Sequence, residues 1–239
     1  MSTILAIETS TELASAALLY QGELIARQSA GTQTHSDAIL PMIQQLLADA
    51  GLALSQCDAL AFGVGPGSFT GVRTACGVVQ GLAFGCDRPV VPVVTLEAAA
   101  QACRDENPQA SDVLAILDAR MGEVYWARYR ARTDGGWETL AEPALSSAAQ
   151  VPVEGRPHAC GNGLSVYAEH FSANFCTAAF ASVQPQAMPH ARQVATLGQV
   201  HFSAGLALPA QQAQPLYLRN KVALTTAERE VRDAAKGVA

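Results

Sequence analysis

The sequence has few charged residues and no run of basic ones, which argues against a chain that binds nucleic acid by itself. Only 15% of its 239 residues are charged, and 15 lysines and arginines stand against 21 aspartates and glutamates, for a formal net charge of −6. Proteins that hold nucleic acid alone usually neutralise its phosphates with a basic patch. Any contact with nucleic acid is therefore expected to be indirect, through a complex.

Long apolar runs are also missing. The best stretch, 90–100, is interrupted by Pro92 and Glu97, whereas a membrane span needs about 18 consecutive apolar residues. The N-terminal segment 1–13 has no basic start and contains two glutamates where a secretory signal would be apolar. The six cysteines show neither CxxC spacing nor the density of a disulfide scaffold. We expect reduced, buried thiols, no membrane span and a cytoplasmic location.

Hydrophobic residues nevertheless make up 49% of the chain, enough for one large domain or two lobes of about 100 residues each. The pattern LAIE at 5–8 is echoed by LAILD at 114–118, and a turn and two strand-like segments follow each. The echo predicts a duplicated α/β lobe, although so short a match can also arise by chance. With the polar segment 104–111 as the boundary, the expected units are a first lobe at 1–105, a smaller second lobe at 106–224, and a frayed or disordered tail at 225–239.

A helix is expected between residues 34 and 51. Either Thr34 or Ser36 can cap its start, and apolar residues then recur on one face at helical spacing. These residues are Ile39, Ile43, Leu46, Leu47 and Ala50. Since proline fits a helix only in its first turn or at a kink, Pro41 indicates that the helix begins near Ala38 or bends there.

The glycine-rich segment GVGPGSFTGVRT, at 63–74, follows a buried strand signal and begins another helix. Its spacing excludes a Walker loop, which needs a Gly-Lys pair, a dinucleotide fingerprint, which needs a third glycine, and a nucleophile elbow around Ser68. What remains is a tight strand-to-helix turn whose free N–H groups make a generic anion site. Because such turns are more often purely structural, the segment is weak support for catalysis.

The helix after this turn carries Gly77, Gly81 and Gly85, one glycine every four residues. An interior glycine costs about 1 kcal/mol relative to alanine, so this stripe needs a reason. It lets another backbone approach closely, either that of a partner protein or that of the chain's own sheet or preceding helix. Arg73, early in the same helix, opposes the helix dipole. We expect it to pair with an acid or another anion, with an ordinary surface arginine as the competing interpretation.

An acidic residue ends the first strand of each predicted lobe, Glu8 in the first and Asp118 in the second. If the lobes are duplicated, the two carboxylates face one another across a cleft. With Thr9 and Ser10 they could then orient the metal and phosphates of a nucleotide, as in actin-like sugar kinases, although either acid could equally cap a turn. No two histidines are three or four residues apart, so a helical two-histidine metal site is not indicated.

Four segments together resemble the TsaB family, whose members are accessory factors in the threonylcarbamoyladenosine modification of bacterial tRNA. They are ILAIETST at the start, THSDAILPMI at 34–43, AFGVGPGSFTGVRT at 61–74 and PLYLR at 215–219. The string GPGSFTGVR is specific for the family, whereas ILAIETS is shared with related actin-like proteins. The resemblance implies an α/β fold of two actin-like, RNase H-like lobes, each a mixed sheet with flanking helices.

The resemblance also implies partners. Members of this family bind TsaD, the subunit that transfers the threonylcarbamoyl group to adenosine 37, as a heterodimer, and the ATPase TsaE joins them. The partner surface of the family is formed by two first-lobe helices, here 35–47 and 68–84. Carried onto this sequence, it includes His35, Ile39, Ile43, Leu46, Leu47, Arg73, Gly77 and Gly81. Without TsaD we expect the same helices to pair in a homodimer, because exposed apolar faces tend to associate.

The leading hypothesis is a non-catalytic subunit that binds and supports TsaD, with tRNA contacted only indirectly. TsaD holds a metal through an HxxxH pair that this chain lacks, so no metal or resident cofactor is expected, although ATP or ADP at the interface of the complex stays open. The alternative is an ATP-binding actin-like kinase or ATPase that uses Glu8, Thr9, Ser10 and Asp118. A peptidase acting on TsaD is a third possibility, for which no residue is nominated.

Overall fold

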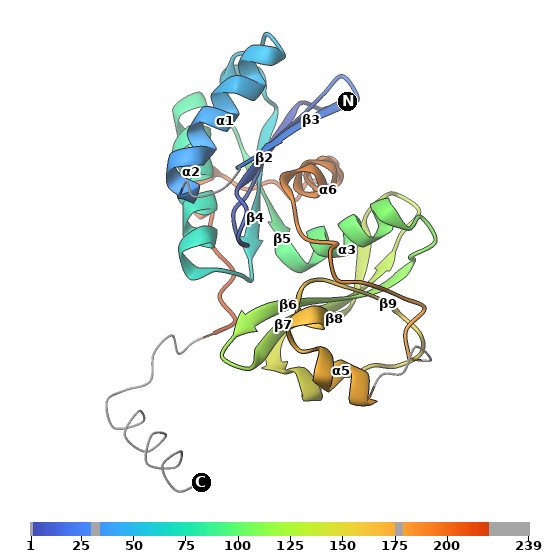
Figure 1. Ribbon diagram of the computed structural model, residues 1–239. Coiled ribbons are helices and arrows are strands. Elements are labelled where there is room, and N and C mark those ends of the chain that lie inside the picture. The colour runs from blue at the N-terminus through green and yellow to red at the C-terminus, as the bar shows by residue number, and fades with distance from the viewer. Residues whose placement is uncertain (1, 30–33, 175–178, 220–239) are drawn as a thin grey trace, which may run out of the picture.

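Two mixed β-sheets form the protein in the computed structural model, which describes residues 2–29, 34–174 and 179–219 (Figure 1). The first sheet has five strands in the spatial order β3 (Glu23–Gln28), β2 (Ser15–Tyr20), β1 (Ile4–Glu8), β4 (Ala59–Gly65) and β5 (Val90–Val94). The second has the order β10 (Ser182–Gln184), β9 (His158–Cys160), β6 (Asp112–Arg120), β7 (Glu123–Ala131) and β8 (Trp137–Ser147). This is the two-lobe, actin-like α/β fold that the resemblance implies.

The two sheets share one topology. In the first, β1 pairs antiparallel with β2 and parallel with β4. In the second, β6 pairs antiparallel with β7 and parallel with β9. The echoed sequences LAIE and LAILD are the central strands β1 and β6, and every residue of β1 is buried, as is usual for a strand covered on both faces. The repeat in the sequence therefore corresponds to a repeat in the fold.

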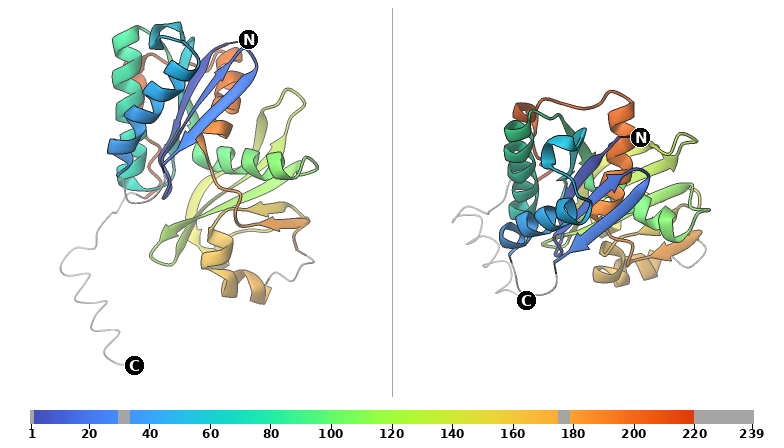
Figure 2. Two further views of the ribbon diagram at one scale, coloured as in Figure 1. Left: turned by 45° about the horizontal axis from the view of Figure 1, so that its top comes forward. Right: turned by 90° about the horizontal axis from the view of Figure 1, so that it is seen from above.

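Helices cover the sheets on both sides (Figures 1 and 2). The bounds are α1 (His35–Asp49), α2 (Phe69–Cys86), α3 (Thr95–Glu106), α4 (Gly163–Val166), α5 (Ala168–Asn174) and α6 (Ala191–Ser203), with 3-10 turns η1 (Leu54–Gln56), η2 (Ala148–Gln150) and η3 (Ala210–Gln212). Helices α1 and α2 share a hydrophobic core with the outer face of the first sheet, and α4 and α5 lie on the outer face of the second. Helices α3 and α6 lie between the sheets and contact each other. In the described part of the chain, no helix has both the length and the hydrophobicity of a membrane span.

Helix α6 packs on the first sheet, against β1, β2 and β4, although it follows the second sheet in the chain. The predicted second lobe, 106–224, includes this helix, so sequence order alone does not assign it to a lobe. The predicted tail at 225–239 lies outside the described residues.

Of the two predicted caps of the first helix, the structure confirms Thr34. Helix α1 begins at His35 after Thr34, whose side chain accepts a hydrogen bond from the Asp37 N–H, and it runs through Pro41. Proline has no N–H to donate, so the helix tolerates the loss of one backbone hydrogen bond there. Helix α2 runs past Gly85 to Cys86, and Asp87, with a φ of 52°, supplies its left-handed cap.

Candidate functional site

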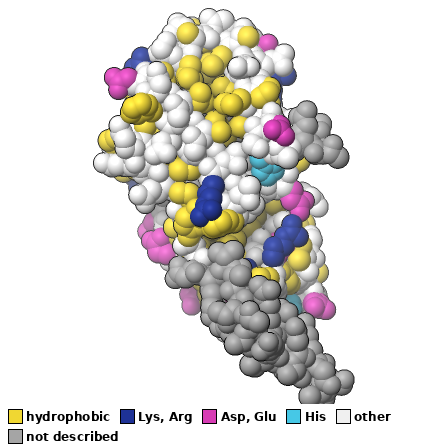
Figure 3. All heavy atoms as spheres, turned by 90° about the vertical axis from the view of Figure 1, so that its left-hand side faces the viewer, with side chains coloured by type: hydrophobic (Ala, Val, Ile, Leu, Met, Phe, Trp, Pro, Cys, Tyr) yellow, Lys and Arg dark blue, Asp and Glu magenta, His cyan; other side chains and the backbone are white. Residues whose placement is uncertain are grey.

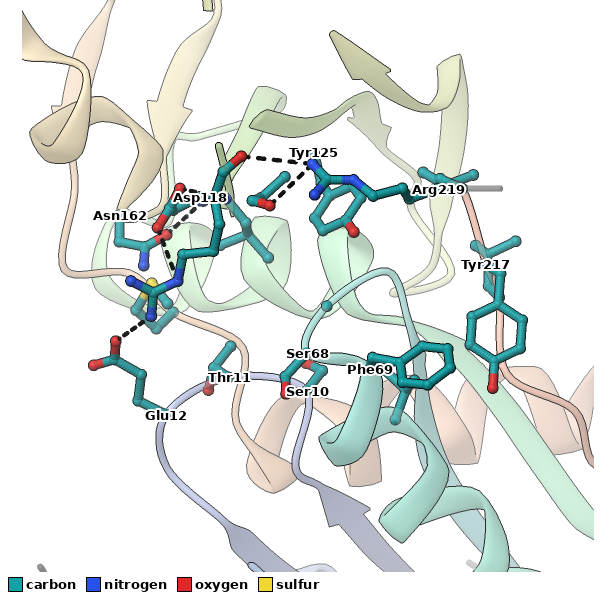
Figure 4. A pocket seen from close by; sticks show the side chains of 18 of the residues that line it. Ser10, Thr11, Glu12, Ser68, Phe69, Asp118, Tyr125, Asn162, Tyr217 and Arg219 are labelled. Atoms are coloured by element: carbon teal, nitrogen blue, oxygen red, sulfur yellow. Dashed lines mark hydrogen bonds and ion pairs between the residues drawn. The ribbon is translucent and has the colours of Figure 1, made fainter. Parts of the chain in front are cut away.

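A cavity of about 470 Å³ lies between the two lobes (Figure 4). Most of its lining comes from the turn after β1, the start of α2, the end of β6 and the extended segment 215–219, and α1, β7 and the turn after β9 contribute single residues. The lining residues that carry polar or aromatic side chains include Ser10, Thr11, Glu12, His35, Ser68, Phe69, Asp118, Arg120, Tyr125, Asn162, Tyr217 and Arg219. The cavity therefore lies where the first strands of the two repeated units end.

The first-lobe wall of the cavity presents hydrogen-bond donors. The Ser68 N–H donates to the Ser10 carbonyl at 2.8 Å, and a Cβ at Gly67 would lie 2.5 Å from that carbonyl oxygen, so only glycine permits this approach. Ser10 is 3% exposed, and its hydroxyl has no hydrogen-bond partner among the described residues. The Ser68 hydroxyl caps the Gly71 N–H of α2 at 3.4 Å, and the earlier N–H groups of a helix have no partner within the helix, so the start of α2 can accept an anionic group.

The second-lobe wall is acidic, and an arginine neutralises it. Asp118 accepts hydrogen bonds from the Arg120 N–H at 2.7 Å and from the Tyr167 hydroxyl at 2.9 Å. The Arg120 guanidinium lies 3.4 Å from Asp118 and 2.9 Å from Glu12, which belongs to the other lobe. A metal-bound nucleotide at Asp118 would have to displace this guanidinium.

The extended segment 215–219 closes one side of the cavity and contacts both lobes. The Leu216 N–H donates to the Val64 carbonyl in the first lobe at 2.8 Å. Arg219 donates to the Ala119 carbonyl at 3.1 Å and forms an ion pair with Glu123, both in the second lobe. This extended segment therefore ties the lobes together beside the cavity.

Glu8 does not face the cavity, which corrects the expectation that it meets Asp118 across a cleft. It is fully buried, and its carboxylate accepts hydrogen bonds from the Ser10 N–H at 2.6 Å and the Thr95 hydroxyl at 3.4 Å. Burial raises the pKa of Glu8, while the hydrogen bonds from Ser10 and Thr95 act in the opposite direction. The carboxylate also lies against Gly63, where a Cβ would come within 1.9 Å of it. Glu8 therefore fixes the turn after β1 from within the lobe.

Thr9 is also inside the first lobe. Its side chain is fully buried, and its hydroxyl donates to the Gly71 carbonyl at 2.7 Å. Of the four residues predicted to form a nucleotide site, only Ser10 and Asp118 line the cavity. The sequence does not indicate that Arg120 pairs with Glu12 and Asp118, because this pairing depends on how the end of β6 lies relative to the turn after β1.

The predicted partner surface divides into buried and exposed residues. Ile39 is 0%, Ile43 3% and Leu46 0% exposed, because they face the first sheet, and Leu47 is partly buried. The folded chain cannot offer the first three to a partner, so their assignment to an interface is wrong. The outward side of α1 carries Leu40 instead, which is 45% exposed.

Helix α2 does expose its glycine stripe. Gly77 and Gly81 are exposed, and a Cβ added at either would meet no described residue within 4 Å. The competing explanation, packing on the chain's own sheet or on α1, therefore does not apply to them. Phe84 on the same helix is 69% exposed. Figure 3 looks onto this side of the molecule, where hydrophobic side chains gather and charged ones are few.

The remaining predicted interface residues lie near the rim of the cavity. The His35 ring nitrogen Nε2 is 3.1 Å from the Glu12 carbonyl oxygen, which links the start of α1 to the turn after β1. Arg73 is exposed on α2 and contacts two aromatic residues, Phe69 and Tyr217. The sequence did not nominate these two residues, although Tyr217 lies in the PLYLR string.

Comparisons with known proteins agree with one another. The model of the family described as TsaD, tRNA N6-adenosine threonylcarbamoyltransferase, matches residues 28–226. The tRNA threonylcarbamoyladenosine biosynthesis protein TsaB of Haemophilus influenzae is 41% identical over 92% of this chain and 94% of its own length. Its namesake from Escherichia coli is 36% identical over 92% of this chain and 96% of its own. The solved structure of YeaZ from Pseudomonas aeruginosa superposes with a TM-score of 0.82 at 38% identity, covering 91% of this chain and 100% of that one. The chain belongs to the TsaB family of tRNA threonylcarbamoyladenosine biosynthesis proteins.

Proposed function

We propose that this chain is a non-catalytic subunit that binds a TsaD-type transferase. In this role it supports transfer of the threonylcarbamoyl group to N6 of adenosine 37 in tRNA. The names of its relatives place them in tRNA threonylcarbamoyladenosine biosynthesis, and the family model is that of the transferase itself. The complex works in the cytoplasm, TsaE joins it, and tRNA reaches this chain only through its partner.

The observation that carries the proposal is the outer face of α2. Two interior glycines there leave open space where a Cβ would stand, as far as the described residues show, yet each costs about 1 kcal/mol of helix stability. A face without side chains allows the backbone of a partner helix to lie close. The exposed side chains beside it, Leu40 and Phe84, would then pack against the partner, as apolar patches on interfaces do.

The cavity between the lobes supports a non-catalytic role. Its one buried carboxylate, that of Asp118, is already engaged by Arg120 and Tyr167. Among the described residues, no three His, Cys, Asp or Glu side chains meet as potential metal ligands. A chain with this cavity supplies a surface more readily than a catalytic centre.

Reconstitution with the TsaD-type subunit of the same organism tests the proposal. Light scattering should show a 1:1 complex, and calorimetry should give its affinity. Transfer of the threonylcarbamoyl group to tRNA should fall strongly when this chain is omitted. Undiminished transfer without the chain, or the absence of a complex, would contradict the proposal.

A second candidate is nucleotide binding in the cavity, as in an actin-like kinase or ATPase. The position of the cavity between the turn after β1 and the end of β6, with Ser10 and the start of α2 on its wall, favours it. Calorimetry with magnesium and ATP on the isolated chain decides: micromolar binding that Ser10→Ala or Asp118→Asn removes would support this candidate. Absence of heat from the wild-type chain at millimolar ATP would eliminate it.

A further inference from the structure

Arg73 is held in a fixed position on the surface by two aromatic residues. Its guanidinium carbon lies 3.6 Å from the centroid of the Phe69 ring, and its Nε donates a hydrogen bond to the Tyr217 hydroxyl at 2.7 Å. The two rings are 5.6 Å apart at an interplanar angle of 40°. Both aromatic residues are largely exposed, Phe69 at 41% and Tyr217 at 42%. Figure 4 shows their rings side by side at the edge of the cavity.

The charge of Arg73 is not neutralised within the described chain. The sequence predicts an acid or anion beside it, yet none of the ion pairs between described residues includes it. Two nearby arginines differ in this respect, since Arg120 pairs with Glu12 and Arg219 with Glu123. A guanidinium has five N–H donors, and Tyr217 engages only the one on Nε. The four donors on the two terminal nitrogens are left for a partner.

We propose that Arg73 is an interface anchor that binds a carboxylate of the TsaD-type subunit, from an aspartate or glutamate side chain on the helix that lies along α2. This inference rests on the proposed function and adds to it the residue and the chemistry of the contact. Arg73, Gly77 and Gly81 follow one another at intervals of four residues, so they lie on one face of α2. A helix seated on the glycine stripe therefore reaches the arginine at the end of the stripe.

The aromatic contacts suit Arg73 to this role. Stacking on Phe69 and the hydrogen bond to Tyr217 restrict the side chain before binding, so less rotamer entropy is lost on association. The planar guanidinium matches a carboxylate in a two-point interaction. Arginine and aromatic residues also carry much of the binding free energy of protein interfaces.

A protein carboxylate fits better than an RNA phosphate. Binding of a nucleic-acid backbone normally uses several cations along a path, but Arg120 and Arg219 are paired with acids and the chain has a net charge of −6. The immediate surroundings of Arg73 are glycine and aromatic residues, which favour close contact with a folded partner.

The test titrates the TsaD-type subunit into the wild-type chain and three variants, with thermal melting as a check that each variant folds. Arg73→Gln should weaken binding by about 30-fold or more, as expected when one member of a buried charge pair is removed. Arg73→Lys keeps the charge but loses the planar fork, so its affinity should lie between those of wild type and Arg73→Gln. Arg192→Gln is the matched control, since Arg192 is an exposed arginine on α6, and its affinity should stay within about twofold of wild type.

The outcomes separate the two proposals. If the wild-type chain does not bind the subunit, the proposed function fails and this inference fails with it. If the wild type binds and Arg73→Gln binds equally well, only the inference is overturned. It is also overturned if Arg73→Gln leaves the heterodimer unchanged but weakens binding of tRNA to the complex, because the guanidinium would then contact a phosphate.

Discussion

Replacing Gly77 and Gly81 by alanine should stabilise the isolated chain and weaken its binding to a partner. Both residues lie in the interior of α2, are exposed, and have nothing within 4 Å of an added Cβ. Within the described part of a single chain, a methyl group at either position therefore meets no neighbour. In a complex, the same methyl group would stand where the partner backbone is expected.

The magnitude follows from the helix propensity of the two residues. Alanine is favoured over glycine in an exposed helix interior by about 1 kcal/mol per position, so the double variant should gain about 2 kcal/mol. For a chain of this size, that gain corresponds to a rise in melting temperature of about 4–8 °C. Urea unfolding, with an unchanged dependence on denaturant, gives the free energy directly.

Gly198→Ala is the matched control, because this glycine also lies inside a helix. A Cβ at Gly198 would lie 2.6 Å from the Cβ of Ala61, so alanine there should destabilise the chain by about 1–3 kcal/mol through overpacking. Opposite signs at the two sites show that solvent exposure, and not glycine in general, decides the effect. A loss of stability in the Gly77/Gly81 variant would refute the assignment of an open stripe.

The binding half of the prediction uses a larger side chain. Gly81→Leu should leave the free chain folded, yet lower its affinity for the TsaD-type subunit by at least about tenfold, because the partner backbone must move away. Equal affinities of Gly81→Leu and wild type would show that the stripe is not the docking face.

Three further results are expected. Leu40→Asp should shift the isolated chain from dimer towards monomer in light scattering, and an unchanged mass would show that the outer side of α1 does not self-associate. Burial by itself would lower the pKa of His201, but the hydrogen bond and charge of Glu97 outweigh it and raise that pKa. The extra unfolding free energy of wild type over His201→Gln should thus be fully present below about pH 6.5 and disappear as the pH rises through the raised pKa of His201. Urea unfolding at several pH values measures this difference. A difference that grows at alkaline pH would contradict the prediction. Glu8→Ala should lower the free energy of unfolding by about 2 kcal/mol or more, since the buried Ser10 N–H loses the carboxylate that accepts its hydrogen bond at 2.6 Å. An unchanged urea unfolding curve would refute the role of Glu8 in fixing the turn after β1.

Local patterns in the sequence predicted α1, α2 and a duplicated α/β lobe, while the actin-like fold followed from the family resemblance. The echo of 5–8 in 114–118 marks the two central strands, and helical spacing placed Ile39, Ile43 and Leu46 correctly on one face of α1. The pattern does not state what covers such a face. The same periodicity fits packing on the chain's own sheet and docking of a partner. The family resemblance assigns the whole helix to the partner surface, so it does not separate the buried face from the exposed one.

The site depended on contacts between distant parts of the chain. An acid at the end of β1 suggested a cleft residue, but Glu8 turns inward because Thr95 offers it a hydroxyl and Gly63 leaves it space. The pairing of Arg120 with Glu12 joins residues from the two lobes. Neither arrangement leaves a signal in local spacing, since each depends on how the sheets and turns are placed relative to one another.

The rate of threonylcarbamoyl transfer to tRNA by the TsaD-type subunit, measured at increasing concentrations of this chain, tests the central claim most directly. If the chain acts by docking, Gly81→Leu and Arg73→Gln lower the rate at limiting concentration, and both recover the wild-type rate at saturation because only affinity has changed. Full transfer without the chain would contradict the account. So would loss of transfer in Asp118→Asn with an intact heterodimer, which would place chemistry in the cavity between the lobes.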